Sequence, residues 1–302
     1  MSFSFEAKNE LCRLPVQKLC CARAEAYGIL LYCNTFSASE VRIITGNPAL
    51  AARLPKLFHR AFGLRFDRLP EEGESGKLVF QITDGGKLRR IVDLLGFSPE
   101  QNLALHINFG VLEEPCCRAA FLRGAFLAGG SVTDPRKGYH LELTTSHLSV
   151  GREMLALMRE MGLEPKAAQR KGNSVVYFKQ SDRIEDLLTS IGAPLSAMEV
   201  MNAKLEKDLR GSVNRRVNCD AANLDKAVEA AMTQVESIRR LEEQGRLALL
   251  PEKLQETASL RLAHPEDTLS QLAQRYDPPI TKSALNHRLR KLVELAKAEP
   301  EK

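Results

Sequence analysis

The stretch FLRGAFLAGGSV, residues 121–132, decides how this chain folds. It begins as a bulky apolar run, carries Gly124 near its middle, and ends in Gly129 and Gly130 before a serine and a valine. A helix that is apolar on most sides is a core helix in a soluble protein, and a glycine within it allows another backbone to come close. The stretch therefore predicts a buried helix that packs tightly against a partner and then leads into a strand.

The partner is expected 96 residues earlier, because the chain contains an internal repeat. CCARAEAYGILL (residues 20–31) and CCRAAFLRGAFL (residues 116–127) have both cysteines, an alanine, the glycine and the last leucine in common. The same offset lays KLVFQITDGGKLRRIVDLLG (residues 77–96) on NSVVYFKQSDRIEDLLTSIG (residues 173–192), apolar position on apolar position. One offset that holds at both ends indicates two copies of one fold unit.

Each copy is expected to contain a small-residue helix, a strand, an amphipathic helix that ends at a glycine, a second strand and a shorter helix. In the first copy these are residues 22–33, 40–45, 49–62, 78–83 and 87–95, and in the second they are residues 119–128, 139–145, 149–161, 175–179 and 184–191. The sequence thus predicts an α+β domain with a pseudo-twofold axis over residues 1–196, in repeats of about 1–100 and 101–196.

A basic segment follows, and we expect residues 197–246 to form a helical linker. Residues 204–216 hold five Lys or Arg against two acids, and Arg215 and Arg216 are adjacent. A solvated helix face is the simpler interpretation of such a run. The segment nevertheless lies between two modules that could face DNA, so both arginines are candidates for DNA contact.

The last part, residues 247–302, is expected to be an all-α helix-turn-helix domain. TLSQLAQRY (residues 268–276) opens with a threonine that can cap a helix, Asp-Pro-Pro then forces a turn, and TKSALNHRLRKLVELA (residues 281–296) places leucines on one side. Asn and Arg side chains can form hydrogen bonds with base edges in the major groove. The alternative is that this polar face of the helix is only exposed to solvent. We predict DNA contacts, with Arg215 and Arg216, from Lys282, Ser283, Asn286, His287, Arg288, Arg290 and Lys291.

Residues 122–130 can be laid over the nine-residue motif of the LAGLIDADG homing endonucleases, which the repeat resembles, and residues 26–34 form a weaker first copy. In that family the eighth motif residue is an acid that helps to hold a divalent metal for phosphodiester hydrolysis. Here the two positions are Cys33 and Gly129, neither of which can hold magnesium. The resemblance therefore implies the scaffold without the reaction, and Asp134, a few residues beyond Gly129, is the alternative acid.

A LAGLIDADG-like repeat followed by a helix-turn-helix is similar to the WhiA family, and RRVNCDAAN (residues 215–223), TKS (residues 281–283) and NHRL (residues 286–289) look like its signatures. This likeness implies a bacterial DNA-binding regulator of transcription, tied to sporulation in actinobacteria and to cell division and chromosome segregation elsewhere, and inactive as an enzyme. Double-stranded DNA is the expected partner, and another transcription regulator or RNA polymerase is a candidate. An active endonuclease and a protein-interaction platform are the alternatives.

The cysteine content and the N-terminal sequence indicate the cellular compartment of the protein and whether it binds a metal ion. Seven cysteines without a CxxC pair, and a start (MSFSFEAKNELCR) unlike a signal peptide, favour a cytoplasmic, nucleoid-associated protein without a membrane partner. Cys20, Cys21, Cys116 and Cys117 are candidates for a four-thiolate metal site. Because neighbouring helical residues point about 100° apart, we expect these thiols not to converge on one ion, and we predict no metal and no cofactor.

Overall fold

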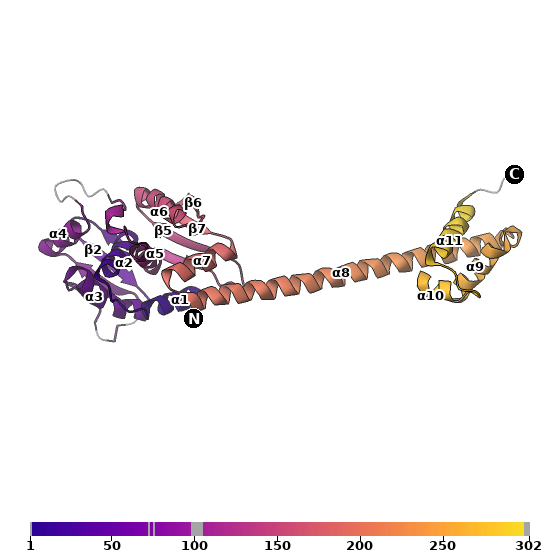
Figure 1. Cartoon of the computed structure of the whole chain (residues 1–302), viewed down its shortest axis with the longest axis horizontal. Helices are drawn as coiled ribbons and strands as arrows, with labels where there is room; N and C mark the ends of the chain where they lie inside the picture. Colours follow the sequence, from indigo (N-terminus) through magenta and orange to yellow (C-terminus); the bar gives the residue numbers. More distant parts are fainter. Residues whose placement is uncertain (1, 72, 75, 98–104, 299–302) are drawn as a thin grey trace. The chain divides into compact units, whose positions relative to one another are not determined.

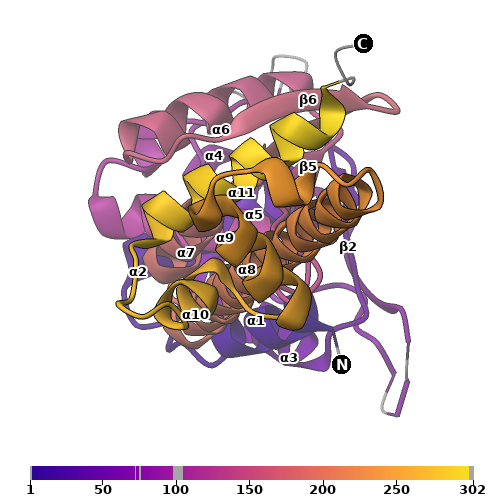
Figure 2. The same ribbon diagram turned by 90° about the vertical axis from the view of Figure 1, so that its right-hand side faces the viewer.

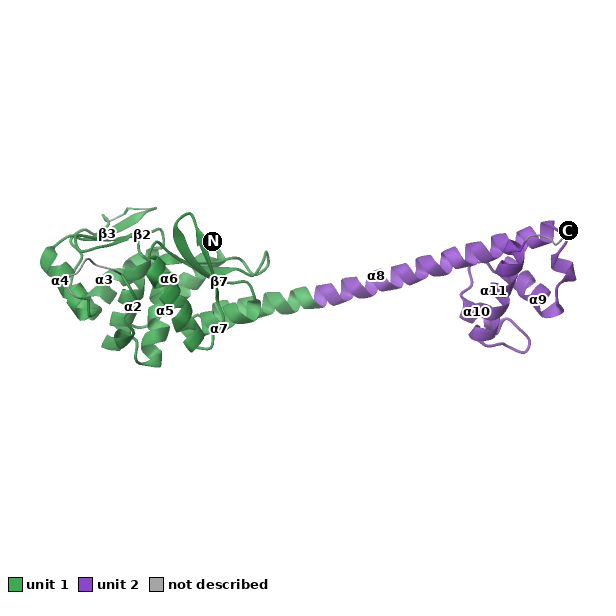
Figure 3. Ribbon diagram, turned by 90° about the horizontal axis from the view of Figure 1, so that it is seen from above, with its two compact units in different colours: residues 1–208 green, residues 209–302 purple. Residues whose placement is uncertain are grey.

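The computed structural model describes residues 2–71, 73–74, 76–97 and 105–298 of the chain, which divides into two compact units, residues 1–208 and residues 209–302 (Figures 1 and 3). Helix α8 (Pro194–Glu243) starts in the first unit and ends in the second. The predicted boundary between the repeats, near residue 100, lies outside the described residues. No helix in the described part of the chain combines the length and the apolar character that a membrane span requires.

The first unit consists of helix α1 (Phe3–Cys12), the two repeats and the start of α8. The first repeat contains α2 (Leu19–Tyr32), β1 (Thr35–Phe36), β2 (Val41–Thr45), α3 (Pro48–Phe62), β3 (Leu78–Ile82) and α4 (Gly85–Leu94). After the short 3-10 helix η1 (Phe109–Val111), the second contains α5 (Pro115–Gly129), β4 (Gly130–Val132), β5 (Leu141–Thr145), α6 (Leu148–Glu160), β6 (Lys166–Arg170), β7 (Asn173–Phe178) and α7 (Ser181–Ile191). The predicted α+β repeat is confirmed, with additional short elements.

Each repeat builds its own antiparallel sheet. The first has the strand order β1-β2-β3 and the second the order β4-β5-β7-β6. The central pairing is the same in both, because Val41 pairs with Ile82 in one and Leu141 with Phe178 in the other. Strand β6 was not predicted because KAAQR is polar and mostly exposed, so it shows no alternation of apolar and polar residues.

Helices α2 and α5 pack side by side through the middle of the unit, and we call this contact the seam (Figure 1). A Cβ atom placed on Gly28 would lie 2.8 Å from Ala125 N and closer still to the Phe121 carbonyl oxygen. A Cβ atom on Gly124 would lie 2.9 Å from the Glu25 carbonyl carbon and closer still to its oxygen. The two backbones therefore touch at both glycines, as the opening stretch predicted.

The seam is not symmetric in its side chains. On one side, Arg123 Nε donates to Glu25 Oε2 at 2.8 Å, and Arg53 Nε of α3 donates to Glu25 Oε1 at 2.6 Å. At the position related by the repeat, the rings of Tyr27 and Phe121 pack with their centroids 5.3 Å apart. Glu25 is buried, and two arginines bond its carboxylate, which offsets the cost of removing that charge from water.

The second unit is an all-α domain formed by the end of α8, the 3-10 helix η2 (Leu247–Leu249), α9 (Glu252–Ala263), α10 (Leu269–Gln274) and α11 (Lys282–Lys297) (Figure 2). Its core is a cluster of apolar side chains from α8 to α11, which includes Ile238, Leu241, Ala258, Leu272, Leu285, Leu289 and Leu292. Helix α8 thus supplies part of this core in addition to the basic segment that the sequence placed there.

Candidate nucleic-acid interface

Helices α10 and α11 begin at capping residues and are joined by a tight turn. Thr268 and Gln271 form a capping box at the start of α10, and Thr281 Oγ1 accepts from Ala284 N at 3.2 Å at the start of α11. Ile280 N donates to Ala273 O at 3.1 Å and closes the turn between them. Both helix starts agree with the sequence-based prediction, since a threonine oxygen satisfies an amide that has no partner in the first turn.

The polar side chains of α11 gather on the side opposite its buried leucines. Six of them lie in the first three turns, five exposed and Asn286 half-buried, and the exposed Glu294 and Lys297 follow on the same side. At 100° per residue they span about half of the helix circumference. We call this surface the α11 arc, and it consists of Lys282, Ser283, Asn286, His287, Arg290 and Lys291.

Arg288 lies outside the α11 arc. Its guanidinium carbon is 5.3 Å from the centroid of the Tyr276 ring, and its Nη1 is 3.9 Å from Glu256 Oε2. Tyr276 in turn donates from its hydroxyl to Thr257 Oγ1 at 2.7 Å within the core. Arg288 therefore packs against this domain, and the structure separates it from the other predicted contact residues.

A groove of about 1220 Å³ borders one edge of the α11 arc. Lys282 and Asn286 line it together with residues of α8, among them Arg239, Glu236 and Glu243. Because acids and bases alternate on its walls, the groove does not provide the single-signed surface that suits a polyanion. The open part of the α11 arc, with Arg290 and Lys291, is the more cationic surface.

In the basic segment of α8, two lysines contact the repeats, whereas two arginines are exposed to solvent. Lys204 pairs with Asp182, and Lys207 Nζ donates to Pro135 O at 2.7 Å while lying 4.3 Å from the centroid of the Tyr139 ring. Arg215 and Arg216 are exposed on α8 in the second unit. The first two lysines thus hold α8 against the repeats, and the arginine pair is open to a partner.

The positions of the lost nuclease acids lie at the C-terminal ends of α2 and α5. Cys33 directly follows α2, and its Sγ donates to the carbonyl oxygens of Leu30 and Thr35 at 3.2 and 3.1 Å. Burial raises the pKa of this thiol to about 12, so it stays protonated and neutral at physiological pH. A Cβ atom on Gly129 would lie 2.6 Å from Thr144 O and 2.8 Å from the Tyr32 ring. The structure therefore has no space for a carboxylate at Gly129.

A cavity of about 280 Å³ lies next to Cys33, one of the two positions of the lost acids, and Lys8 forms part of its lining. The described residues that line it include Lys8 and no carboxylate. Burial lowers the pKa of Lys8 to about 8, which still leaves most of the amine charged at neutral pH. Asp134 is not part of this lining, and its Oδ1 accepts from Arg136 N at 2.9 Å within a turn. A cation in the cavity repels a divalent metal ion.

The expectation that the four cysteines of the repeat do not converge was wrong. The sulfur atoms of Cys20, Cys21, Cys116 and Cys117 all lie within 4.8 Å of one another. Two neighbouring positions on a helix, about 100° apart, can lie on either side of the line that faces the partner helix, and the glycine contacts bring that partner unusually close. The shared offset of 96 residues was the sequence signal that relates both cysteine pairs by one axis.

The fold and this surface together define a class of protein in which a LAGLIDADG-type pair of repeats is joined to a helix-turn-helix domain. Residues 118–210 match the WhiA LAGLIDADG-like domain, and residues 213–296 match the WhiA C-terminal HTH domain. The chain is 37% identical to the probable cell division protein WhiA of Alkaliphilus oremlandii, over 98% of this chain and 97% of that protein. It is also 37% identical to the probable cell division protein WhiA of Clostridium novyi, over 98% of both.

The crystal structure of full-length WhiA from Thermatoga maritima has the same fold, with a TM-score of 0.61 and 22% identity over 100% of both chains. The chain belongs to the WhiA family. This confirms the resemblance on which the sequence-based expectations rested.

Proposed function

We propose that this chain is a DNA-binding regulatory protein that recognises duplex DNA without cutting it. The observation that carries the proposal is the α11 arc, an exposed surface of cationic and amide side chains on the second helix of a helix-turn-helix. Such a helix enters the major groove with its early residues at the base edges. Asn286 suits an adenine edge and Arg290 a guanine edge, while Lys282, Ser283, His287 and Lys291 suit bases or phosphates.

Arg288 has no base-reading role in this proposal, because it packs on Tyr276. Arg215 and Arg216, on α8 in the helical linker of residues 197–246, instead serve as phosphate contacts in addition to those made by the DNA-binding domain of residues 247–302. Contacts of this kind add affinity without sequence preference and make binding sensitive to salt.

The same proposal assigns no catalytic residue to the repeats. The packed Gly129, the neutral Cys33 thiol and the Lys8 amine support a scaffold that no longer holds a metal for hydrolysis. Full-length protein incubated with supercoiled plasmid and magnesium or manganese is expected to leave the plasmid intact. Nicking that disappears in Asp134→Asn would instead establish the endonuclease alternative.

The cellular role proposed here is control of cell division, and with it chromosome segregation or, in a sporulating organism, sporulation. The names of the relatives support cell division, while the other two roles rest on the family resemblance alone. We further propose a cytoplasmic, nucleoid-associated protein that acts with RNA polymerase or a second transcription regulator. Mapping of the bound genomic sites tests this, because sites that avoid the promoters of division genes contradict it.

The decisive experiment measures sequence-specific binding in vitro. Full-length protein selects its target from a random duplex library, and fluorescence anisotropy then compares that target with scrambled DNA. Asn286→Ala and Arg290→Ala are each expected to weaken binding to the target by about 1–3 kcal/mol and to leave scrambled DNA less affected. Lys253→Ala, an exposed charge on α9, is the matched control and should change neither. Equal losses on both DNAs would remove base reading by α11 from the proposal.

A further inference from the structure

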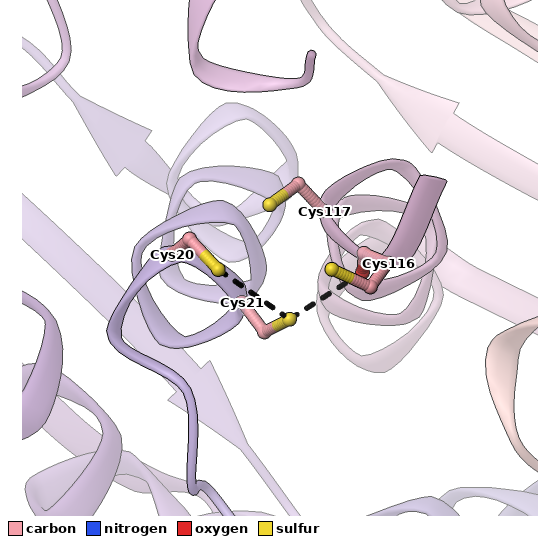
Figure 4. Close-up of side chains that lie close together, drawn as sticks. All are labelled: Cys20, Cys21, Cys116 and Cys117. Carbon is pink, nitrogen blue, oxygen red and sulfur yellow. Dashed lines mark hydrogen bonds between the residues drawn. The ribbon is translucent and has the colours of Figure 1, made fainter. Parts of the chain in front are cut away.

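Four cysteines, two from each repeat, converge at the end of the seam where α2 and α5 begin (Figure 4). Cys20 and Cys21 lie in the first turn of α2, and Cys116 and Cys117 lie in the first turn of α5. Their four sulfur atoms are within 4.8 Å of one another, and those of Cys20 and Cys21 are 4.0 Å apart. The cluster lies at the opposite ends of these helices from Cys33 and Gly129, so it is separate from the lost nuclease site.

The spacing of the sulfur atoms suits one small ion. A tetrahedral zinc ion holds each thiolate at about 2.3 Å, which places the sulfur atoms about 3.8 Å from one another. The cluster reaches that spacing if its sulfur atoms move by about 1 Å or less, a distance that small rotations about χ1 supply. An iron–sulfur cluster inserts several atoms between its thiolates and would need the helices to separate, which the glycine contacts of the seam oppose.

Two opposing effects act on the thiols of the cluster: burial raises the pKa of Cys117 far above its usual range and that of Cys21 to about 11, whereas the position at two helix N-termini favours negative charge. The first amide groups of a helix have no carbonyl partner within it, and together with the helix dipole they make its N-terminus electropositive. Here two helix N-termini meet at the same four sulfur atoms, which lowers the free energy of negative charge at each of them. Cys117 is buried and Cys20 is exposed, so the site has an enclosed inner side and an outer side through which an ion can enter.

The repeat relates the ligands in pairs, because the offset of 96 residues carries Cys20 onto Cys116 and Cys21 onto Cys117. Two equivalent pairs around one axis match the twofold symmetry of a tetrahedron. A disulfide, by contrast, needs only two sulfur atoms at about 2.05 Å and gives no reason for four to converge.

We propose that Cys20, Cys21, Cys116 and Cys117 bind a single zinc ion that cross-links the first turns of α2 and α5. As each sulfur becomes a ligand, its thiol proton is released to solvent, and no oxidation or reduction takes place. The ion joins one repeat to the other at the end of the seam. This site does not depend on DNA binding by the second unit.

The test uses full-length protein, reduced and stripped of metal, and titrates it with zinc in competition with a chromophoric chelator. We expect about one equivalent of zinc per chain. Cobalt as a substitute should give thiolate-to-metal charge-transfer bands and the intense visible bands of a tetrahedral site. Cys20→Ser, which changes an exposed side chain and so leaves the fold intact, is expected to bind zinc about 100-fold more weakly, because one of four ligands is lost. Circular dichroism checks the fold.

Cys219→Ser is the matched control, since Cys219 is also exposed but lies in the second unit. It should bind zinc as tightly as the wild type. The proposal is overturned if the reduced wild type takes up no zinc, if the cobalt complex lacks thiolate bands, or if both variants lose zinc equally. It is also overturned if mass spectrometry finds disulfides across the seam in a protein that never takes up zinc.

Discussion

Replacement of Gly124 by alanine tests the backbone contact at the seam. The new methyl carbon would lie 2.9 Å from the Glu25 carbonyl carbon and 3.0 Å from Ile29 N. Both are backbone atoms of α2, so no side chain can rotate away to make room. The methyl group needs about 3.5–4.0 Å from these atoms, and the Glu25 carbonyl oxygen lies closer still, so the helices must separate by at least about 1 Å.

A separation of this size costs more than alanine gains as a better helix former. A gap of 0.5–1 Å forfeits about a quarter to a half of each dispersion contact across it, and Tyr27, Leu31, Phe121 and Ala125 are among the buried residues of these two helices. Overpacking alone typically costs about 1–3 kcal/mol. The gain in helix propensity offsets only about 1 kcal/mol. We expect Gly124→Ala to lower the free energy of unfolding by about 2 kcal/mol, the upper end of the overpacking range less the gain in helix propensity.

The assay is urea unfolding followed by circular dichroism, with Gly85→Ala as the control. Gly85 also lies in a helix, and nothing is within 4 Å of a Cβ atom added there, so this change should be neutral or slightly stabilising. Gly28→Ala should behave like Gly124→Ala, and the double variant should lose less than the sum, since one separation of the helices serves both methyl groups. A loss below about 1 kcal/mol for Gly124→Ala, with an unchanged m value, would refute close backbone packing as the reason for these glycines.

Three further predictions concern single side chains. Glu25→Ala leaves the Arg53 and Arg123 guanidinium groups without their carboxylate and should destabilise the first unit by about 3–5 kcal/mol, measured by urea unfolding; an effect under 1 kcal/mol contradicts this. Lys8 has a pKa lowered by burial from 10.5 to about 8, so the unfolded chain holds this proton between these pH values and the native chain does not. The Lys8 contribution to stability therefore rises with pH across that window, by on the order of 3 kcal/mol, and the difference between wild type and Lys8→Met should show this slope. Thr268→Ala removes the capping box of α10 and should cost about 1 kcal/mol in thermal unfolding of the second unit, whereas Ser270→Ala should cost less.

Much of the fold could be predicted because the sequence contains an internal repeat, so that each element of the fold unit occurs twice. Gly28 and Gly124 marked the tight helix contact, and the 96-residue offset marked the pairing of the helices, since both signals come from periodic packing. The edge strand β6 was missed because its polar residues carry no burial pattern. The helical linker expected over residues 197–246 corresponds to helix α8, which begins three residues earlier, at Pro194.

The candidate interface was predicted less completely. Helical periodicity placed the α11 arc correctly on the side away from the core, but it could not show that Arg288 packs on the Tyr276 ring, which depends on the tertiary position of α10. Lys8 in the cavity beside Cys33 was missed for a similar reason, because α1 comes to that cavity only through the fold. The convergence of the four cysteines was not predicted, because the spacing along one helix does not determine how near the second helix comes.

The uneven side chains of the seam specify which halves can associate. Two copies of the first repeat paired with each other would place Glu25 against Tyr27 on both sides, and two copies of the second would place Arg123 against Phe121. The first arrangement leaves each Glu25 with Arg53 as its single counter-ion, and the second buries Arg123 without a carboxylate, so both are less stable than the pairing of unlike halves. The side chains of the seam thus favour the pairing of the first repeat with the second over the pairing of either repeat with a copy of itself. Halves produced as separate polypeptides should accordingly form a heterodimer in preference to either homodimer.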